Sequence, residues 1–498
     1  MSFARIDRRQ FLSSALGTTA FQAAPRRQRP PNILLVCSDE HNHRVAGCYG
    51  SSLARTPHLD SLAARGVVFD TCYTNSPLCV PSRLAFTAGK YIHRISAWNN
   101  NTRLPSDDYP SVPHLLNAAG YESFLCGKQH YDARHRYGFI EIGGNMNSSR
   151  MAGRGNRRRA DDETVNVKAG QDRFNEFHPG DDSRILQHDR RVTAGVLDFL
   201  AKRSRSDKPF FLFAGYVAPH FPLIVPEQHW SHFRGRIPMP EIPPGFLESL
   251  PLNYKHLRRG FGLVDVPADT VRRGRELYYG LTEWVDNEIG QVLAALEGSP
   301  FARDTVVIYS TDHGENMGEH GLWWKNCLYE QAAHIPLMVS WPERFKGGQR
   351  RAGACSTVDL AATVVELGGA KVPGDWNGTS LLRRLDDPTA PWRDRAVSQY
   401  YAHNIASGYS MLRTGDWKYI YHAAPDAQHP AERELYSLKA DPGEFRNLAS
   451  DPAQRQRVAS LHAQLLKELG EDPEETERRC RAEFARGYPD AEPKKRAA

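Results

Sequence analysis

The stretch PPNILLVCSDEH (30–41) places a short, continuous apolar run directly before Asp39. Such a run, without alternating polar residues, is typical of a parallel β-strand that is buried on both faces. Two further stretches share this character: KPFFLFAGYVAPHFP (208–222), which reaches His220, and DTVVIYSTDHGENMGEHG (304–321), which reaches Asp312 and His313. The sequence therefore predicts buried strands that each carry an acid or a histidine at the carboxyl end.

The segments between these strands carry helical periodicity, as in ELYYGLTEWVDNEIGQVLAALE (276–297). Strands that alternate with helices predict an α/β fold, a doubly wound, mostly parallel central sheet with helices on both faces. Ligands of such sheets bind beyond the carboxyl ends of the strands. We therefore expect acids and histidines from distant segments to converge there.

Charge and cysteine content exclude several classes of protein. The 498 residues carry a formal net charge of +6, but residues 1–28 hold five arginines against one aspartate, so the remainder is nearly balanced. This balance does not indicate nucleic-acid binding. The eight cysteines include no CxxC pair, which argues against a disulfide framework. The sequence contains no run of about 18 apolar residues, so it predicts no transmembrane span.

The N-terminal stretch IDRRQFLSSALGTTAFQAAPRRQRP (6–30) has Arg8 and Arg9 before a weakly apolar run and small residues. Residues 1–28 resemble a twin-arginine export signal, with a disordered basic tail as the alternative. The signal predicts a partner in the twin-arginine export machinery and a periplasmic or secreted protein.

The remaining chain divides into a main domain over 29–389 and a C-terminal subdomain with a tail over 390–498. The sequence over about residues 143–183 of the main domain lacks periodicity, which predicts a surface insertion. The arginines of this insertion, at 154 and 157–159, either bind a polyanionic substrate or form a solvated face. Short alternating runs with turn dipeptides after 390 predict a small antiparallel sheet, followed by a helix near 452–470. The C-terminal subdomain is therefore expected to be α+β.

The stretch SPLCVPSRLAFTAGKYIHR (76–94) places Cys79 at the expected start of a helix, four residues before Arg83. The N-terminus of a helix and a nearby arginine both stabilise a thiolate, so Cys79 is a candidate nucleophile. A buried structural cysteine is the alternative.

Residues 78–89 of this stretch contain C-x-P-S-R followed by T-x-G. They resemble the signature of the type I, formylglycine-dependent sulfatases of the alkaline phosphatase superfamily, a group that includes arylsulfatases and choline sulfatases. Five other segments agree in order, within about residues 32–451: PNILLVCSDEH (31–41), GKQH (127–130), APHFP (218–222), STDHGENMGEHG (310–321) and KNCLYEQAAHIPL (325–337). The resemblance implies a sulfuric ester hydrolase, with 29–389 as its catalytic domain.

The resemblance gives Cys79 a different role from that of a thiolate. In this family a formylglycine-generating enzyme oxidises the cysteine of C-x-P-S-R to an aldehyde. The hydrated aldehyde is a geminal diol, in which one hydroxyl attacks sulfur and the other later releases its proton to expel sulfate. Cys79 is thus expected to be converted to formylglycine during maturation.

Hydrolysis of a sulfate ester also needs a cation to neutralise the sulfate oxygens. Asp39 and Asp312 are hard oxygen ligands suited to Ca²⁺, with His313 or Glu40 completing the shell. Many family members have Asp at the place of Glu40 and Asn at the place of His313, so Glu40 is in doubt as a direct ligand, and Mg²⁺ or Mn²⁺ stays open. Alternatively, acids at strand ends simply cap the following helices.

Five basic residues match the remaining catalytic positions of the family: Arg83, Lys128, His130, His220 and Lys325. Arg83, one helical turn after Cys79, is expected to hold the diol and the metal-bound carboxylates, with a surface salt bridge as the alternative. Lys128 and His130 alternate on a segment expected to be extended, so both point toward one site. The resemblance implies that Lys128 grips a sulfate oxygen, that His130 orients or deprotonates the diol, and that His220 and Lys325 protonate or polarise the leaving-group oxygen.

We expect the substrate to be an O-sulfated carbohydrate, because of the export signal and the basic insertion, with choline sulfate or a small aryl sulfate left open. Trp98, Asn99 and Asn100 follow the nucleophile helix and either bind a sugar or support the core. Two alternative functions are a phosphonate monoester or phosphodiester hydrolase of the same superfamily and a non-catalytic, exported glycan-binding protein. The Lys-x-His pair and Ser82 favour sulfate, and the filled catalytic positions favour an enzyme.

Overall fold

The computed structural model describes residues 30–144, 146–147 and 171–486. The predicted export signal at residues 1–28 and the arginines at 154 and 157–159 lie outside the described residues. Within the described ranges, no helix is both long enough and apolar enough to cross a membrane.

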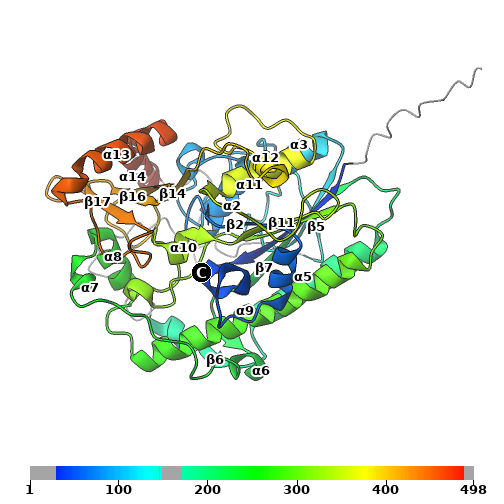
Figure 1. The fold of residues 1–498 in the computed structure, drawn as a ribbon, viewed down its shortest axis with the longest axis horizontal. Coiled ribbons are helices and arrows are strands. Elements are labelled where there is room, and N and C mark those ends of the chain that lie inside the picture. The colour runs from blue at the N-terminus through cyan, green and yellow to red at the C-terminus, as the bar shows by residue number, and fades with distance from the viewer. Residues whose placement is uncertain (1–29, 145, 148–170, 487–498) are drawn as a thin grey trace, which may run out of the picture.

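An eight-stranded sheet forms the middle of the fold (Figure 1). Its strands, in spatial order, are β12 (Gln349–Arg351), β2 (Val67–Phe69), β11 (Leu337–Ser340), β9 (Thr305–Thr311), β1 (Asn32–Asp39), β7 (Phe210–Pro219), β4 (Glu122–Gly127) and β5 (Ile140–Ile142). β1 pairs in parallel with both β9 and β7, and β4 continues the parallel run beyond β7. β11 runs antiparallel to β9 and β2. The prediction of a mostly parallel central sheet is confirmed.

Helices cover both faces of this sheet because both faces are apolar. Alternate residues of β1 enter different cores, Leu34 and Val36 on one face and Ile33 and Leu35 on the other. The first core is covered by α1 (Pro57–Ala64), α5 (Arg184–Lys202) and α9 (Ala268–Glu297), and the second by α2 (Cys79–Ala88), α3 (Val112–Ala118) and α11 (Thr357–Leu367) (Figure 1). The doubly wound arrangement predicted from the sequence is therefore present.

The C-terminal region contains a separate antiparallel sheet of β14 (Ala396–Tyr400), β15 (Tyr409–Thr414), β16 (Trp417–His422) and β17 (Glu432–Ser437). Two helices, α13 (Arg455–Leu469) and α14 (Pro473–Arg486), follow this sheet in the chain and lie beside it (Figure 1). The predicted α+β character and the helix near 452–470 are confirmed. α14 was not predicted, because its sequence is strongly charged.

Shorter elements complete the fold. They are the strands β3 (Cys72–Tyr73), β10 (His334–Ile335) and β13 (Cys355–Ser356), the pair β6 (Phe177–Pro179) and β8 (Leu223–Val225), and the helices α6 (Glu227–Trp230), α7 (Phe246–Ser249), α8 (Leu252–Gly260), α10 (Glu330–Ala333) and α12 (Leu382–Asp386). The described end of the predicted surface insertion joins the core, because Phe174 and Phe177 are both buried. The lack of periodicity there did not predict this packing.

Candidate active site

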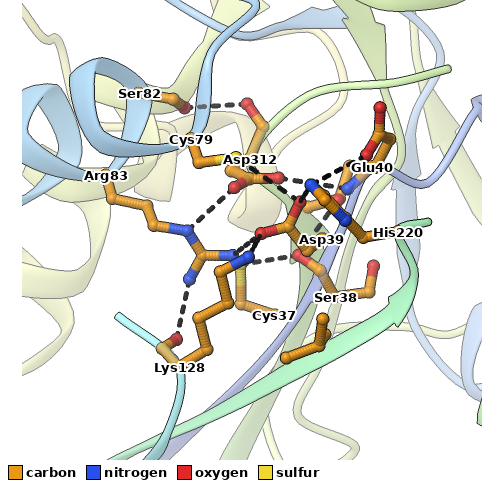
Figure 2. Close-up of polar contacts among 12 residues, drawn as sticks. Cys37, Ser38, Asp39, Glu40, Cys79, Ser82, Arg83, Lys128, His220 and Asp312 are labelled. Carbon is orange, nitrogen blue, oxygen red and sulfur yellow. Dashed lines mark hydrogen bonds and ion pairs between the residues drawn. The ribbon is translucent and has the colours of Figure 1, made fainter. Parts of the chain in front are cut away.

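Four adjacent strands bring the predicted residues to one edge of the sheet. Asp39 ends β1, Asp312 follows β9, His220 follows β7 and Lys128 follows β4. Figure 2 shows Arg83 and Lys128 on one side of Asp39, with Glu40 and His220 on the other. The convergence expected beyond the carboxyl ends of the strands is therefore present.

Cys79 is the first residue of α2, as its sequence context predicted. Its Sγ lies 3.2 Å from Nε2 of His313 and 3.7 Å from Oδ1 of Asp39. Burial and the Asp39 carboxylate raise the pKa of the Cys79 thiol to about 12. The thiol is therefore protonated at neutral pH, so its position at the start of a helix does not make it a thiolate nucleophile.

Arg83 lies one turn farther along α2 and is 2 % exposed. Its Nε donates to Oδ2 of Asp312 at 2.8 Å, and its Nη2 donates to Oδ2 of Asp39 at 3.0 Å. The alternative of a surface salt bridge is excluded, because all three side chains are buried. Arg83 therefore fixes the two strand-end carboxylates relative to α2, which carries Cys79.

Lys128 binds the same carboxylate from the other side, with Nζ 2.5 Å from Oδ2 of Asp39. Although burial favours the neutral acid, the positive charges of Lys128 and Arg83 hold the pKa of Asp39 well below its ordinary value. Asp39 is therefore ionised and surrounded by cationic groups.

The expected extended segment at Lys128 and His130 is wrong. β4 ends at Gly127, whose φ of 96° turns the chain, and His130 has a φ of 62°. A Cβ at Gly127 would lie 2.2 Å from the carbonyl oxygen of Gly215, so the close approach to β7 requires glycine. The Nδ1 of His130 is buried and has no hydrogen-bond partner among the described residues, so this side chain has capacity to bind a ligand.

His220, Lys325 and Glu40 form a second group beside Asp39. Lys325 Nζ lies 2.7 Å from Nε2 of His220 and 2.9 Å from Oε2 of Glu40. His220 Nδ1 lies 2.5 Å from the carbonyl oxygen of Phe221, to which it donates, so its Nε2 accepts from Lys325. Burial and the charge of Lys325 keep the pKa of His220 well below its ordinary value. Lys325 is thus the proton-bearing member of the pair.

Asp39, Asp312 and His313, with Cys79, are placed to hold a metal ion. His313 Nδ1 lies 3.1 Å from the carbonyl oxygen of Gly314 and donates to it, which leaves a lone pair on Nε2. That Nε2 faces Oδ1 of Asp312 at 3.6 Å and Oδ1 of Asp39 at 3.7 Å. Three acceptor atoms that face one another in a buried site fit a cation, and a backbone carbonyl commonly fixes a ligating histidine in this way.

Glu40 occupies an unusual backbone position for a site residue. Its φ is 69°, and the hydroxyl of Tyr278 donates to its carbonyl oxygen at 2.5 Å while accepting from Asn42 N at 2.8 Å. Burial raises the pKa of Glu40 to about 8, although Lys325 opposes the shift. Within the part of the chain that the structure describes, Oε1 of Glu40 is buried and forms no hydrogen bond of normal geometry, and the nearby Glu315 carboxyl raises the pKa of Glu40 further. Glu40 therefore binds Lys325 through one oxygen and keeps the other for a cation or a proton.

Two residues that support this site were not predicted. Tyr278 lies on α9, where the helical pattern indicates only a core aromatic. Asp189 on α5 accepts from the backbone N–H groups of Val217 and Ala218, both at 2.8 Å, and so fixes the end of β7 before His220. Neither residue lies in a motif, and only the tertiary packing brings them to the site.

Trp98, Asn99 and Asn100 differ in their burial and hydrogen bonding. Trp98 is 1 % exposed, and its indole N–H donates to Glu483 at 2.5 Å. Asn99 is buried, whereas Asn100 accepts from Val80 N at 3.1 Å in the first turn of α2. The packing of Trp98 supports the second reading left open by the sequence, core support, and Asn100 supports the helix that carries Cys79.

Comparison of the sequence with models of known families identifies the family of this protein. The sequence model described as Sulfatase matches residues 31–370, which is more than half of the chain and includes all the residues of the cluster. The chain belongs to the sulfatase family. This confirms the enzyme class predicted from the sequence, a sulfuric ester hydrolase of the alkaline phosphatase superfamily. A second model, N-sulphoglucosamine sulphohydrolase, C-terminal, matches residues 318–471.

Two curated relatives extend the likeness over most of this sulfatase. Arylsulfatase K of dog is 28 % identical over 473 residues, covering 88 % of this chain and 84 % of the relative. Arylsulfatase K of Homo sapiens is 27 % identical over 466 residues, covering 87 % and 82 %. The alignment therefore includes the C-terminal sheet of the sulfatase as well as its central one.

Solved structures confirm the fold of the sulfatase. A protein in complex with its substrate D-glucosamine-2-N,6-O-disulfate superposes with a TM-score of 0.71 at 23 % identity, covering 90 % of this chain and all of that one. The phosphonate monoester hydrolase of Agrobacterium radiobacter superposes with a TM-score of 0.72 at 20 % identity, covering 88 % and 95 %. Because both superpose equally well, fold alone does not separate sulfate from phosphonate chemistry.

Proposed function

We propose that this sulfatase hydrolyses the sulfate ester of an O-sulfated carbohydrate, with Cys79 in its formylglycine form as the nucleophile and a divalent cation at Asp39, Asp312 and His313. The observation that carries the proposal is the position of Cys79. It lies beside the residues that would hold the cation and close to the basic side chains that would bind sulfate. Its Sγ lies against His313 and Asp39, at 3.2 and 3.7 Å, and Asp39 also touches the cations that would bind sulfate. A protonated thiol at this position is a poor nucleophile, which supports its conversion.

The residues around Cys79 fit a cation, and we propose Ca²⁺ because two of the three ligands are carboxylates. When bound, the cation would neutralise the sulfate oxygens, and the hydrated aldehyde would supply the attacking hydroxyl. Arg83 holds both carboxylates in place for this role. Glu40 could add a ligand through its unpartnered Oε1.

The basic residues form two pairs, of which one is proposed to act on the sulfate group and the other on the leaving oxygen. Lys128, 13 % exposed, is placed to bind a sulfate oxygen, and His130 offers an unpartnered Nδ1 to orient or deprotonate the nucleophile. On the other side, Lys325 carries the proton that the leaving oxygen needs, and His220 positions it at 2.7 Å. Their placement on opposite sides of Asp39 supports in-line displacement.

The carbohydrate substrate is supported by the solved structure that binds D-glucosamine-2-N,6-O-disulfate, which is that protein's substrate. Its 23 % identity carries the fold and not the sugar, so the sugar is part of the proposal. The export signal predicted at residues 1–28 adds support for a substrate outside the cytoplasm, in the periplasm or the medium. We further propose that oxidation of Cys79 by the formylglycine-generating enzyme precedes twin-arginine export, which carries folded protein.

Phosphonate monoester hydrolysis is the second candidate, because the hydrolase of A. radiobacter shares the fold. Lys128 and His130 favour sulfate, because the resemblance associates a Lys-x-His pair with sulfatases rather than with phosphonate hydrolases. Rates on 4-nitrophenyl sulfate and on a 4-nitrophenyl phosphonate ester, measured with one enzyme preparation, would separate the two. A higher kcat/KM on the phosphonate would replace the proposal.

Mass spectrometry of the tryptic peptide that contains Cys79 is the first test. The protein is produced with the formylglycine-generating enzyme and compared with protein produced without it, and the metal content of both is measured. We expect conversion of the thiol to the aldehyde, turnover of sulfated sugars only in converted protein, and none in Cys79→Ala. An unmodified thiol in a protein that still hydrolyses sulfate esters would refute the nucleophile assignment.

A further inference from the structure

The loop that precedes Lys325 is closed by one buried carboxylate. Glu315 is 3 % exposed, and its Oε1 accepts from the backbone N–H of Met317 at 2.8 Å and from that of Trp324 at 2.6 Å. Met317 and Trp324 stand at the two ends of the loop 317–324, and Lys325 follows directly. A single oxygen atom therefore joins the ends of the loop from which Lys325 reaches the site.

Both residues that bind Glu315 have a backbone conformation that is unfavourable for a residue with a side chain. The φ angle is 50° at Met317 and 63° at Trp324, and residues other than glycine rarely adopt positive φ because Cβ then crowds the backbone. Asn326, on the other side of Lys325, also has a positive φ, of 82°. Such conformations persist only where surrounding contacts enforce them. The hydrogen bonds to Glu315 are such contacts.

Further hydrogen bonds fix the backbone on both sides of Lys325. The carbonyl oxygen of Trp324 accepts from the backbone N–H and from the side-chain amide of Asn316, both at 2.8 Å. After Lys325, the N–H of Asn326 donates to the carbonyl oxygen of Pro77 at 3.1 Å, in the segment that leads into α2. The main chain around Lys325 is thus joined both to the segment that follows β9 and to the segment that precedes α2.

The Lys325 side chain leaves little tolerance for movement of this loop. It is 8 % exposed, and its Nζ lies 2.7 Å from Nε2 of His220 and 2.9 Å from Oε2 of Glu40. Displacement of a catalytic group by about 1 Å can lower a rate about 100-fold. The hydrogen bonds that hold the main chain before Lys325 therefore bear directly on where its proton is delivered.

We propose that Glu315 is a positioning residue for Lys325, which accepts from Met317 and Trp324 and thereby holds the main chain that aims the Lys325 ammonium at the leaving oxygen. The inference rests on the proposed function, because it takes Lys325 as the proton donor. Glu315 itself makes no contact with the substrate in this role. The reach of its acceptor oxygen matters, and its charge does not. The alternative is a role in folding or at the cation site, since Glu315 is two residues from His313.

Two variants separate reach from charge. Glu315→Gln keeps an acceptor oxygen at the same distance along the side chain but removes the charge, whereas Glu315→Asp keeps the charge and shortens the side chain by one methylene group. Glu319→Gln is the control, because it changes an acid of the same loop that pairs with Arg275 instead. The melting temperature, the metal content and the conversion of Cys79 are measured for each protein before rates are compared.

The rates should show a loss that depends on reach and on the leaving group. On a sulfated sugar, Glu315→Asp should lower kcat about 10- to 100-fold and Glu315→Gln by less than about 3-fold. On 4-nitrophenyl sulfate, whose leaving group needs no proton, both should change kcat by less than about 3-fold. In a Lys325→Met background, Glu315→Asp should lower kcat by less than about a further 3-fold. Glu319→Gln should leave both rates unchanged.

Hydrogen exchange of the backbone amides tests the same contact without any substrate. Mass spectrometry of peptides that contain Met317 and Trp324 should show faster exchange in Glu315→Asp and unchanged exchange in Glu315→Gln. Unchanged exchange in Glu315→Asp, together with a selective loss on sugars in Lys325→Met, would overturn the inference and leave the proposed function intact. Faster exchange, with equal losses on both substrates in Lys325→Met as well, would sustain the positioning of Lys325 and refute its assignment as proton donor.

Three further results would overturn the inference. Equal losses on both substrates in Glu315→Asp alone would indicate a role in folding, and loss of the metal from that variant would indicate a role at the cation site. A loss above about 3-fold on sulfated sugars in Glu315→Gln would show that the charge matters. This last result does not depend on whether Glu315→Asp folds.

Discussion

Replacement of Lys325 by methionine tests the assignment of the leaving-group acid. Lys325 Nζ lies 2.7 Å from His220 Nε2, and His220 already uses its Nδ1–H on the Phe221 carbonyl. His220 therefore has no proton of its own to give at neutral pH, and Lys325→Met removes the donor. General acid catalysis contributes about 10²- to 10⁴-fold, which corresponds to roughly 3–5 kcal/mol in the activation barrier.

The loss should depend on the leaving group. A sugar alkoxide is a strong base and needs the proton, so kcat on a sulfated sugar should fall by about 10²- to 10⁴-fold. The 4-nitrophenolate ion is stable without a proton, so kcat on 4-nitrophenyl sulfate should fall by less than about 10-fold. Both rates are measured on one preparation whose Cys79 conversion has been quantified by mass spectrometry.

Two features keep this comparison interpretable. Lys325 lowers the pKa of buried Glu40, so without it Glu40 takes up a proton more readily and does not remain as an unpaired charge. Lys90→Met, which removes a lysine paired with exposed Asp375, controls for the substitution itself. An equal loss on both substrates, at unchanged melting temperature, would refute proton delivery by Lys325 and indicate a role in binding sulfate.

Further predictions address the metal, the backbone and the core. Chelation should abolish turnover and lower the melting temperature, because a cation present at 100 times its Kd stabilises the folded protein by about 2.7 kcal/mol. Titration back with Ca²⁺, Mg²⁺ and Mn²⁺ should identify the ion. An unchanged melting temperature would count against the metal site. Tyr278→Phe removes the hydrogen bond to the Glu40 carbonyl and should lower kcat about 10-fold with little change in KM, whereas an unaltered kcat would show that Glu40 holds its backbone alone. Burial raises the pKa of Asp286 from 3.8 to about 7, so between these pH values the folded protein keeps a proton that the unfolded chain releases. The free energy of unfolding should therefore fall by up to about 4 kcal/mol between about pH 4 and pH 7. Thermal melts of Asp286→Asn should lack this pH-dependent component. Trp98→Phe loses the bond to Glu483 and should lower the melting temperature while leaving KM for sulfated sugars unchanged, and a raised KM would restore Trp98 to the sugar site.

The sequence predicted the nucleophile half of the site because short-range rules govern it. Asp39 and Asp312 follow apolar runs, and parallel strands place their carboxyl ends at one edge. Arg83 follows Cys79 by one helical turn, so their proximity depends only on α2 being a helix. Lys128 also lies at this edge, but because the chain turns after β4 and not because the segment is extended, as the alternation of Lys128 and His130 had predicted.

The rest could not be predicted because it depends on contacts between distant segments. Tyr278 reads as a core aromatic of α9, and its hydroxyl gains a role only where the chain turns at Glu40 with positive φ. Phe174 and Phe177 lie in a stretch without periodicity and pack because β6 meets β8. The highly charged sequence of α14 gives no apolar face, although Cys480 is fully buried.

The two halves of the site differ in how the chain supports them. Arg83 and Lys128 bind carboxylates fixed at the ends of central strands, so a change there should disturb Asp39 and, through it, both the proposed metal site and Cys79. Lys325 and His220 both contact the ring of Phe221, which belongs to a connection outside the central sheet. We expect substitutions around that ring to act first on His220 and Lys325, which also contact Glu40. If Glu40 is a ligand of the cation, such substitutions should also weaken metal binding, so metal content has to be measured beside kcat for each variant.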